Sequence, residues 1–158
     1  MLSRPGKGDR VSGLWIGNKT PSVVVIDPAG AEAARRNAGD SALLLSVFQT
    51  GDSVAARDRS APHFLTFNRS DDSNRVQDIL TALAFLKQEG APDLRVVGTG
   101  KAAVWAFFAA AVAPIRVLAD SPGAAFTGSD QDFIDQLFVS GIQRAGGLKA
   151  AEICARLP

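Results

Sequence analysis

The sequence predicts an α/β protein: a three-layer fold with a mainly parallel sheet of about five strands and helices on both faces. Short apolar runs rich in Val, Ile and Leu alternate along the chain with longer segments of helical period. In residues 94–105 an apolar run ends in a glycine-rich turn, and an apolar helix follows at once, as in many α/β enzymes. The length of 158 residues fits one domain, 1–158, in which the polar residues 1–10 are expected to be flexible.

Five segments are the predicted strands: residues 11–16, 23–26, 42–48, 94–97 and 115–119. The last four are apolar without alternation, which is typical of strands buried on both faces of a parallel sheet. Right-handed crossovers and one change of winding direction put 23–26 beside 94–97 at the centre. The expected spatial order is therefore 11–16, 42–48, 23–26, 94–97, 115–119, with 11–16 as an antiparallel edge.

The first two predicted helices flank the third strand along the chain. Residues 31–38 are rich in Ala and Arg, and Gly39 is expected to end this helix. A clear amphipathic helix is expected to begin at the caps Asp71 and Asp72 and to end before Gly90. A loop of about 22 residues, 49–70, separates the third strand from the second of these helices. Loops of this length are usually functional or mobile.

Three further helices are predicted in the second half of the chain. Residues 101–113 are apolar on all sides, so this helix is expected to be central and buried. Its aromatic residues are expected in the core: Trp105, Phe107 and Phe108. Ser129 and Asp132 resemble a capping box that begins a helix continuing through 133–144. Residues 148–156 form the last predicted helix.

Composition excludes several classes of function. Net charge is +1 and the basic residues are scattered, so no nucleic-acid partner is expected. No apolar run reaches the roughly 18 residues of a spanning helix, and residues 1–13 contain no apolar signal region. We therefore expect no membrane association, and the cytoplasm is the default location. One His and one Cys lie far apart, which predicts no metal site, and Cys154 is expected to be a small core residue.

The turn Gly98-Thr99-Gly100-Lys101-Ala102 has the small-x-nucleophile-x-small pattern of a nucleophile elbow. Its centre, Gly100, has no side chain that could attack a substrate. A phosphate-binding P-loop is excluded, because Arg95 and Ala102 stand where that pattern needs Gly and Ser or Thr. Ligands of open α/β sheets bind beyond the carboxyl ends of the central strands. The candidate pocket residues there are Asp27, Gly30, Gly98, Thr99, Lys101, Asp120 and Ser121.

Several segments resemble a known family. They are residues 63–72 (HFLTFNRSDD) with the helix after them, the turn 27–30 (DPAG), the elbow and residues 145–148 (AGGL). From about Val11 onward the chain resembles bacterial esterase-like proteins of the α/β-hydrolase superfamily, of the acetylxylan-esterase or deacetylase type. This resemblance implies an α/β-hydrolase fold, a serine-hydrolase site at the elbow and a small-molecule ester or acyl ligand, with no cofactor.

The chain departs from this family at the residues that catalysis needs. Active members carry Ser or Cys where Gly100 stands, and the family fold continues past the position of Arg156 with two strands that bear the triad acid and histidine. A Ser-His-Asp mechanism needs all three groups within hydrogen-bond reach. We expect a partial hydrolase fold that is inactive or non-standard as a serine hydrolase, with His63 as a weak base candidate. The alternative is an ester hydrolase with an unusual or oligomer-completed site.

A dinucleotide-binding module is a second alternative. Gly98-x-Gly100-x-x-Ala103 follows a predicted strand and opens a helix, as a dinucleotide turn does. The next strand ends at Asp120, where a carboxylate could bind a ribose hydroxyl of an NAD-type cofactor. Such a unit normally begins a domain with several more strands, whereas only helices are predicted after Asp120.

The strand 115–119 is expected to be an edge of the sheet. In the full hydrolase fold two later strands cover this one, and the given sequence predicts no strand after it. An uncovered apolar edge presents unpaired backbone groups to other chains. We therefore expect a homodimer in which two copies of strand 115–119 pair across a two-fold axis. The alternative is that the predicted helices 133–144 and 148–156 fold over this edge and protect it.

Overall fold

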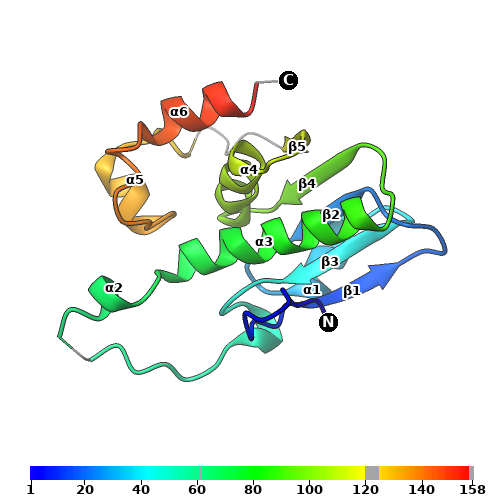
Figure 1. The fold of residues 1–158 in the computed structure, drawn as a ribbon, viewed down its shortest axis with the longest axis horizontal. Helices are drawn as coiled ribbons and strands as arrows, with labels where there is room; N and C mark the ends of the chain where they lie inside the picture. The colour runs from blue at the N-terminus through cyan, green and yellow to red at the C-terminus, as the bar shows by residue number, and fades with distance from the viewer. Residues whose placement is uncertain (61, 120–124, 157–158) are drawn as a thin grey trace.

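The computed structural model of the protein describes residues 1–60, 62–119 and 125–156. A five-stranded sheet forms the centre, in the spatial order β1-β3-β2-β4-β5 (Figure 1). β1 runs antiparallel to β3, and the other three neighbouring pairs are parallel. The predicted order and the antiparallel edge are therefore confirmed, and the fold belongs to the α/β class. The strands are β1 Ser12–Ile16, β2 Val23–Ile26, β3 Ala42–Ser46, β4 Leu94–Gly98 and β5 Val117–Ala119.

Three predicted strands are longer than the observed ones: β1 by one residue, and β3 and β5 by two residues each. β3 ends at Ser46 because side chains of the following long helix bind the next backbone groups: the Asp78 carboxylate accepts the N–H of Phe48 (2.8 Å), and Arg75 donates to its carbonyl (3.0 Å). β5 begins at Val117 rather than at 115 because its partner β4 begins at Leu94, directly opposite Val117. Pairing therefore sets the ends of the strands, which hydrophobicity alone does not.

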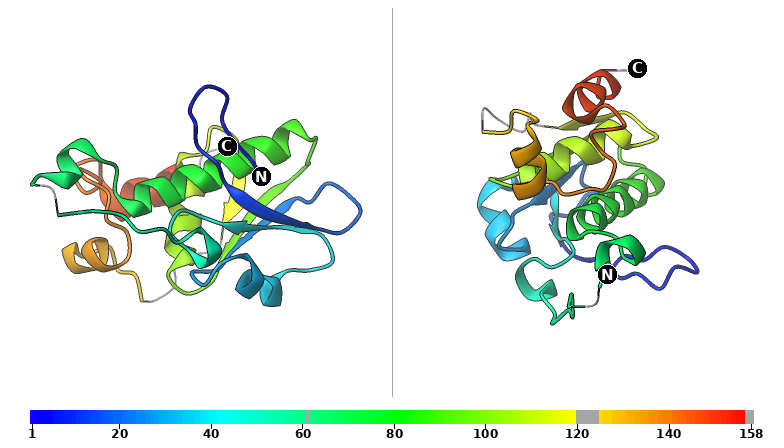
Figure 2. Two further views of the ribbon diagram at one scale, coloured as in Figure 1. Left: turned by 90° about the horizontal axis from the view of Figure 1, so that it is seen from below. Right: turned by 90° about the vertical axis from the view of Figure 1, so that its left-hand side faces the viewer.

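The helices cover the two faces of the sheet unequally. The helices are α1 Ala31–Ala34, α2 Phe64–Phe67, α3 Asp71–Gln88, α4 Ala102–Val112, α5 Asp130–Asp135 and α6 Gly147–Cys154, with 3₁₀ turns η1 Arg35–Asn37 and η2 Gly51–Ser53. α3 and α4 pack against each other and over one face, where they form the larger core with Val24, Leu45 and Val96. On the other face lies α1 (Figure 2, left). It covers a smaller cluster around Val25 and Leu44.

The central position of α4 agrees with its sequence. Nine of its eleven residues are buried, including Trp105, Phe107 and Phe108, so these aromatic residues belong to the core as predicted. Only near its carboxyl end does α4 expose a large apolar side chain, that of Val112. No helix in the described ranges is both long enough and apolar enough to cross a membrane.

Several helix predictions need correction. The helix predicted over 31–38 ends at Ala34, continues as the turn η1, and is closed by an extended Ala38 rather than by Gly39. α3 is capped by Ser70, whose hydroxyl accepts the N–H of Ser73 (3.2 Å), so Asp71 and Asp72 lie in the first turn instead. A hydroxyl one residue earlier reaches the free N–H group, which leaves both carboxylates available for other partners.

The two C-terminal helices are shorter than predicted. Ser129 caps α5 and accepts the N–H of Asp132, as expected, but α5 ends at Asp135 instead of continuing through 144. Beyond that point side chains from other helices bind the backbone: Trp105 donates to the carbonyl of Gln136 (3.2 Å), and Asp72 accepts the N–H of Phe138 (2.8 Å). α6 ends at Cys154, whose side chain is exposed, so its predicted core position is wrong.

Candidate functional site

The turn between β4 and α4 is sharp. A Cβ on Gly98 would lie 2.2 Å from the carbonyl oxygen of Ala102, so the strand and the helix approach too closely for any larger residue. Gly100 has φ +50° and open space where its Cβ would be. This conformation favours glycine, because a side chain there is strained even without a steric clash. The turn therefore has the tight geometry of an elbow, with an exposed residue at its centre that carries no reactive atom.

The turn after β2 meets this elbow at the carboxyl ends of the two central strands. The Thr99 hydroxyl donates to the Asp27 carboxylate (2.5 Å), and the Thr99 N–H donates to the carbonyl of Ile26 (3.0 Å). The structure thus brings together Asp27, Gly98 and Thr99, three of the predicted pocket residues. We call this junction of residues 26–31 and 98–101 the crevice.

Three backbone donors on the Asp27 side of the crevice, those of residues 29–31, are in use. Pro28 has no N–H group. The Ala29 N–H donates to the Asp27 carboxylate (2.8 Å), the Gly30 N–H to the Asp27 carbonyl (2.9 Å), and the Ala31 N–H to the Ser46 hydroxyl (3.2 Å). Residues 29–31 therefore offer no free backbone donor to a ligand.

Gly30 has a structural role in the same turn. Its φ is +98°, and a Cβ there would lie 2.7 Å from the Cα of Gly51, in the loop after β3. Both glycines thus permit two turns to pack backbone against backbone. Gly30 was predicted as a pocket residue, whereas the structure buries it between these turns.

A hollow of about 590 Å³ lies next to the crevice. The elbow contributes Lys101 to its wall, and the loop before α3 contributes His63, so the two candidates meet there although 38 positions separate them in the chain. We call this space the hollow. Its described lining residues are Arg59, His63, Phe64, Leu65, Ser70, Asp71, Asp72, Arg75, Lys101 and Phe138.

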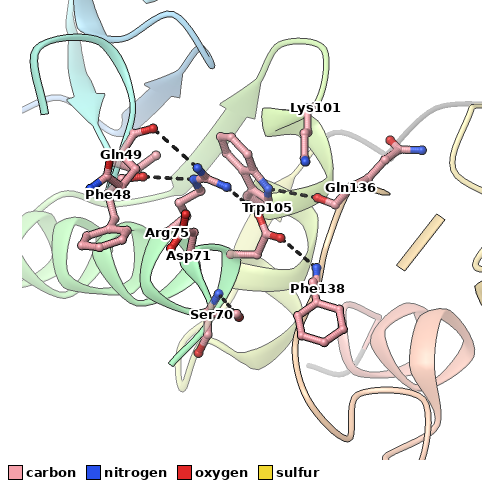
Figure 3. A network of polar contacts seen from close by, with 12 residues as sticks. Phe48, Gln49, Ser70, Asp71, Arg75, Lys101, Trp105, Gln136 and Phe138 are labelled. Carbon is pink, nitrogen blue, oxygen red and sulfur yellow. Dashed lines mark hydrogen bonds and ion pairs between the residues drawn. The ribbon is translucent and has the colours of Figure 1, made fainter. Parts of the chain in front are cut away.

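A buried ion pair forms the floor of the hollow. Arg75 donates to Asp72 (2.7 Å), and the exposed fractions of these side chains are only 14% and 9%. The Arg75 guanidinium also lies 4.6 Å from the ring centre of Trp105, in a cation–π contact (Figure 3). Among the described residues no buried side-chain polar atom lacks a hydrogen-bond partner, so this charged floor is fully satisfied.

Arg75 also fixes the loop after β3. Its guanidinium donates to the carbonyls of Phe48 and Gln49 (Figure 3). Gln49 has a positive φ of 57°. Asp78 holds the same loop from the next turn of α3 through the N–H of Phe48. Burial raises the pKa of Asp78 to about 6, although the hydrogen bond from Phe48 acts in the opposite direction.

The loop that carries His63 is fastened above the N-terminal end of α3. Arg57 lies between two aromatic rings, 5.3 Å from the centre of Phe48 and 4.8 Å from that of Phe64. Arg57 also pairs with Asp71 (2.8 Å), and Arg59 pairs with the second oxygen of the same carboxylate. The predicted long loop is therefore anchored by charged side chains, and η2 and α2 lie within it.

The floor of the hollow is not predicted from the sequence. Asp72 and Arg75 stand three residues apart on one helix face, which is a spacing that permits an ion pair. The sequence contains that signal but does not indicate burial, which comes from Trp105 and residues 136–138. Two other predicted pocket residues, Asp120 and Ser121, lie outside the described residues. Within the described ranges no group of three His, Cys, Asp or Glu side chains is arranged to hold a metal ion.

A comparison with protein-family models finds no match to this chain, and a search of curated proteins finds no significant relative. A function is therefore inferred from the geometry of the crevice and of the hollow.

Proposed function

We propose that the chain is an esterase-like protein with a partial, three-layer α/β-hydrolase fold, and that it binds an ester or acyl ligand without hydrolysing it by a serine mechanism. The order β1-β3-β2-β4-β5 with an antiparallel edge, followed by an elbow after β4, supports the fold proposal. Helices over both faces of the sheet support it further. The fold alone does not define an activity, so the site carries the functional argument.

The observation that carries the proposal is the state of the crevice. Acyl transfer at an elbow needs a nucleophile, together with an oxyanion hole made by two backbone N–H groups. Gly100 supplies no nucleophile. The turn after β2 would supply one of the two N–H groups, yet the N–H groups of residues 29–31 are bound within the turn and to Ser46. The Asp27 carboxylate is also fixed at this point by Thr99, and a negative charge there disfavours a developing oxyanion.

The proposal is tested with p-nitrophenyl acetate as substrate. We expect turnover by the purified protein to equal that of a heat-denatured control. Gly100→Ser restores a hydroxyl at the elbow, and we expect it to remain inactive because the oxyanion donor is still missing. Turnover by the unmodified protein that a serine-directed inhibitor abolishes would contradict the proposal. Specific activity that rises with protein concentration would instead support the alternative of an oligomer-completed ester hydrolase.

One observation favours the dinucleotide alternative: β4 and β5 are parallel neighbours joined by α4, as in a dinucleotide-binding unit. The Asp27 carboxylate beside Thr99 opposes a bound pyrophosphate, and we therefore rank this function second. A thermal-shift titration with NAD tests it. We expect no shift, whereas a saturable rise in melting temperature would favour the nucleotide function.

We also propose that β5 mediates a homodimer. Within the described residues β5 pairs only with β4, and its Leu118 side chain is 52% exposed. Antiparallel pairing of two β5 strands across a two-fold axis would satisfy backbone groups of both edges. The hollow contains no residue of β5, so the dimer would leave it accessible.

A further inference from the structure

We propose that the hollow binds a carboxylate with an apolar body, the acid rather than the ester, and that Lys101 binds its carboxylate group. This inference narrows the proposed ester or acyl ligand to the free acid, and it rests on the proposed function only for the absence of hydrolysis.

Charge is the first argument. Two carboxylates line the hollow, and guanidinium groups neutralise both: Asp72 pairs with Arg75, while Asp71 pairs with Arg57 and Arg59. Lys101 has no carboxylate within ion-pair distance among the described residues. The surroundings of Lys101 in the hollow are therefore positive, and the group that would complement them is an anion.

The ammonium group of Lys101 has hydrogen-bonding capacity for this anion. An ammonium group has three N–H donors. One of them donates to the carbonyl of Asp135, which holds the side chain at the wall of the hollow. Two donors remain for a ligand as far as the described residues show. Lys101 also precedes the eleven-residue helix α4, whose N-terminal dipole adds a favourable potential for a negative group.

The apolar lining is the second argument, and it distinguishes a carboxylic acid from a small inorganic anion. Phe64, Leu65 and Phe138 line the same hollow, and Leu65 and Phe138 are 47% and 38% exposed. Removal of these apolar surfaces from water is favourable, and an alkyl or aryl group of a ligand would cover them. The hollow, of about 590 Å³, lies within the roughly 300–1,000 Å³ typical of small-molecule sites, so it admits a medium-sized acid.

The hollow is also preorganised on both sides. Arg57 and Arg59 fasten the loop of His63 and Phe64 to α3 through Asp71. On the other side, three hydrogen bonds hold residues 135–138. Lys101 and Trp105 each donate to a backbone carbonyl of this segment, and the Phe138 N–H donates to Asp72. A ligand therefore needs little ordering of the protein, which favours binding.

Isothermal titration with octanoate tests the inference, with methyl octanoate and inorganic phosphate as comparison probes. We expect octanoate to bind saturably, and the ester and phosphate to bind at least ten-fold more weakly. Lys101→Gln should weaken octanoate binding at least ten-fold, whereas Lys101→Arg, which keeps the charge, should bind within three-fold of the unmodified protein. Lys87→Gln, at the far end of α3, is the matched control and should have no effect. Melting temperatures show whether each variant is folded.

Equal binding of acid and ester, or unchanged binding by a folded Lys101→Gln variant, would overturn the inference. So would the absence of saturable octanoate binding. Leu65→Ala offers an independent test of the apolar wall, because it leaves every charge in place; we expect a three- to ten-fold loss of octanoate affinity and none of phosphate affinity. These outcomes are distinct from turnover of p-nitrophenyl acetate. A protein that hydrolyses the ester and binds octanoate would contradict only the proposed absence of hydrolysis, and one that neither hydrolyses the ester nor binds octanoate would contradict only this inference.

Discussion

The crevice and the hollow lie side by side and differ in how their polar groups are satisfied. In the crevice, polar groups of short turns are hydrogen-bonded to nearby groups. The N–H donors after β2 bind Asp27 and Ser46, and the Thr99 hydroxyl joins the two turns by donating to Asp27. In the hollow, side chains from three separate segments meet and leave a space of about 590 Å³. Where backbone groups are paired locally, nothing remains for a substrate. Where charged side chains line an open space, a ligand can be recognised.

Under the proposed function, the elbow carries out no chemistry and the hollow binds the ligand. The elbow keeps the tight backbone of an enzyme turn without its nucleophile. The hollow combines charged and apolar surface, and the one hydroxyl among its described lining residues, that of Ser70, caps α3. Changes that disturb the floor of the hollow or the packing of the crevice therefore test the comparison directly.

The largest expected effect is that of Asp72→Ala. This change leaves the Arg75 guanidinium buried without its carboxylate and removes the acceptor of the Phe138 N–H. Removal of one partner of a buried ion pair costs about 3–5 kcal/mol of unfolding free energy. Urea denaturation measures the loss.

Two companion variants calibrate that result. Asp72→Asn keeps an acceptor for Phe138 and should lose less stability than Asp72→Ala. Asp93→Ala changes an exposed carboxylate with no ion pair among the described contacts and should lie within about 0.5 kcal/mol of the unmodified protein. If Asp72→Ala also fell in that range, the ion pair would not be a structural floor of the hollow.

Three glycine substitutions separate steric contact from backbone strain. Gly98→Ala places a Cβ 2.2 Å from a carbonyl oxygen and should cost about 3 kcal/mol or more. Gly100→Ala has open space but a φ of +50°, and should cost about 1–3 kcal/mol; Gly100→Ser should behave similarly. Gly39→Ala has open space and no positive φ, so it is the neutral control. Melting temperatures that rank differently would show that the crevice is not tightly packed.

The pH dependence of stability distinguishes the buried loop anchor from an exposed cap. Burial raises the pKa of Asp78 from 3.8 to about 6, so the folded protein binds this proton more tightly than the unfolded chain does. Its contribution is therefore most favourable below about pH 4, and it decreases as pH rises towards 6, by at most about 3 kcal/mol. Asp78→Asn should remove this slope and stabilise the protein at pH 7.

Asp132 provides the opposite dependence. Hydrogen bonds from Thr127, with a smaller contribution from Ser129, lower its pKa to about 2. Its contribution is present above the unfolded pKa of 3.8 and is lost as pH falls through about 2. Urea denaturation from pH 3 to 8 measures the free energy of unfolding of the unmodified protein and of Asp78→Asn. The difference between the two curves isolates the contribution of Asp78. A difference that does not change between pH 4 and 6 would contradict the raised pKa.

The smallest expected effect on folding stability is that of Leu118→Lys, at the edge strand β5. Its exposed side chain takes no part in either the crevice or the hollow. A charge at a sheet edge opposes pairing with another chain. We expect light scattering to give a dimer for the unmodified protein and a monomer for this variant, with octanoate binding unchanged. A monomeric unmodified protein at high concentration would rule out the pairing.

Much of the fold follows from the sequence, because apolar runs and glycine turns are local signals. The run Val23–Ile26 and the turn at Gly98 are predicted from a few neighbouring residues, and the crossover rule then orders the strands. The ends of elements are less predictable. Gln136 and Phe138 leave the helical pattern because Trp105 and Asp72 bind their backbone, and this competition arises only in the folded chain.

By itself the sequence determined the α/β class, the strand order and the vacant centre of the elbow at Gly100, since each depends on residue type and chain order. Only the tertiary structure decided which side chains share a space. It placed Lys101 and His63, 38 positions apart in the chain, in the wall of one hollow, and it buried the ion pair of Asp72 and Arg75. It also paired the Ala29 N–H with the Asp27 carboxylate, so that this donor is not free for a ligand. Packing decides these contacts because segments that are distant in the sequence meet in space to form the hollow. The local sequence of one segment does not indicate which other segment lies opposite it.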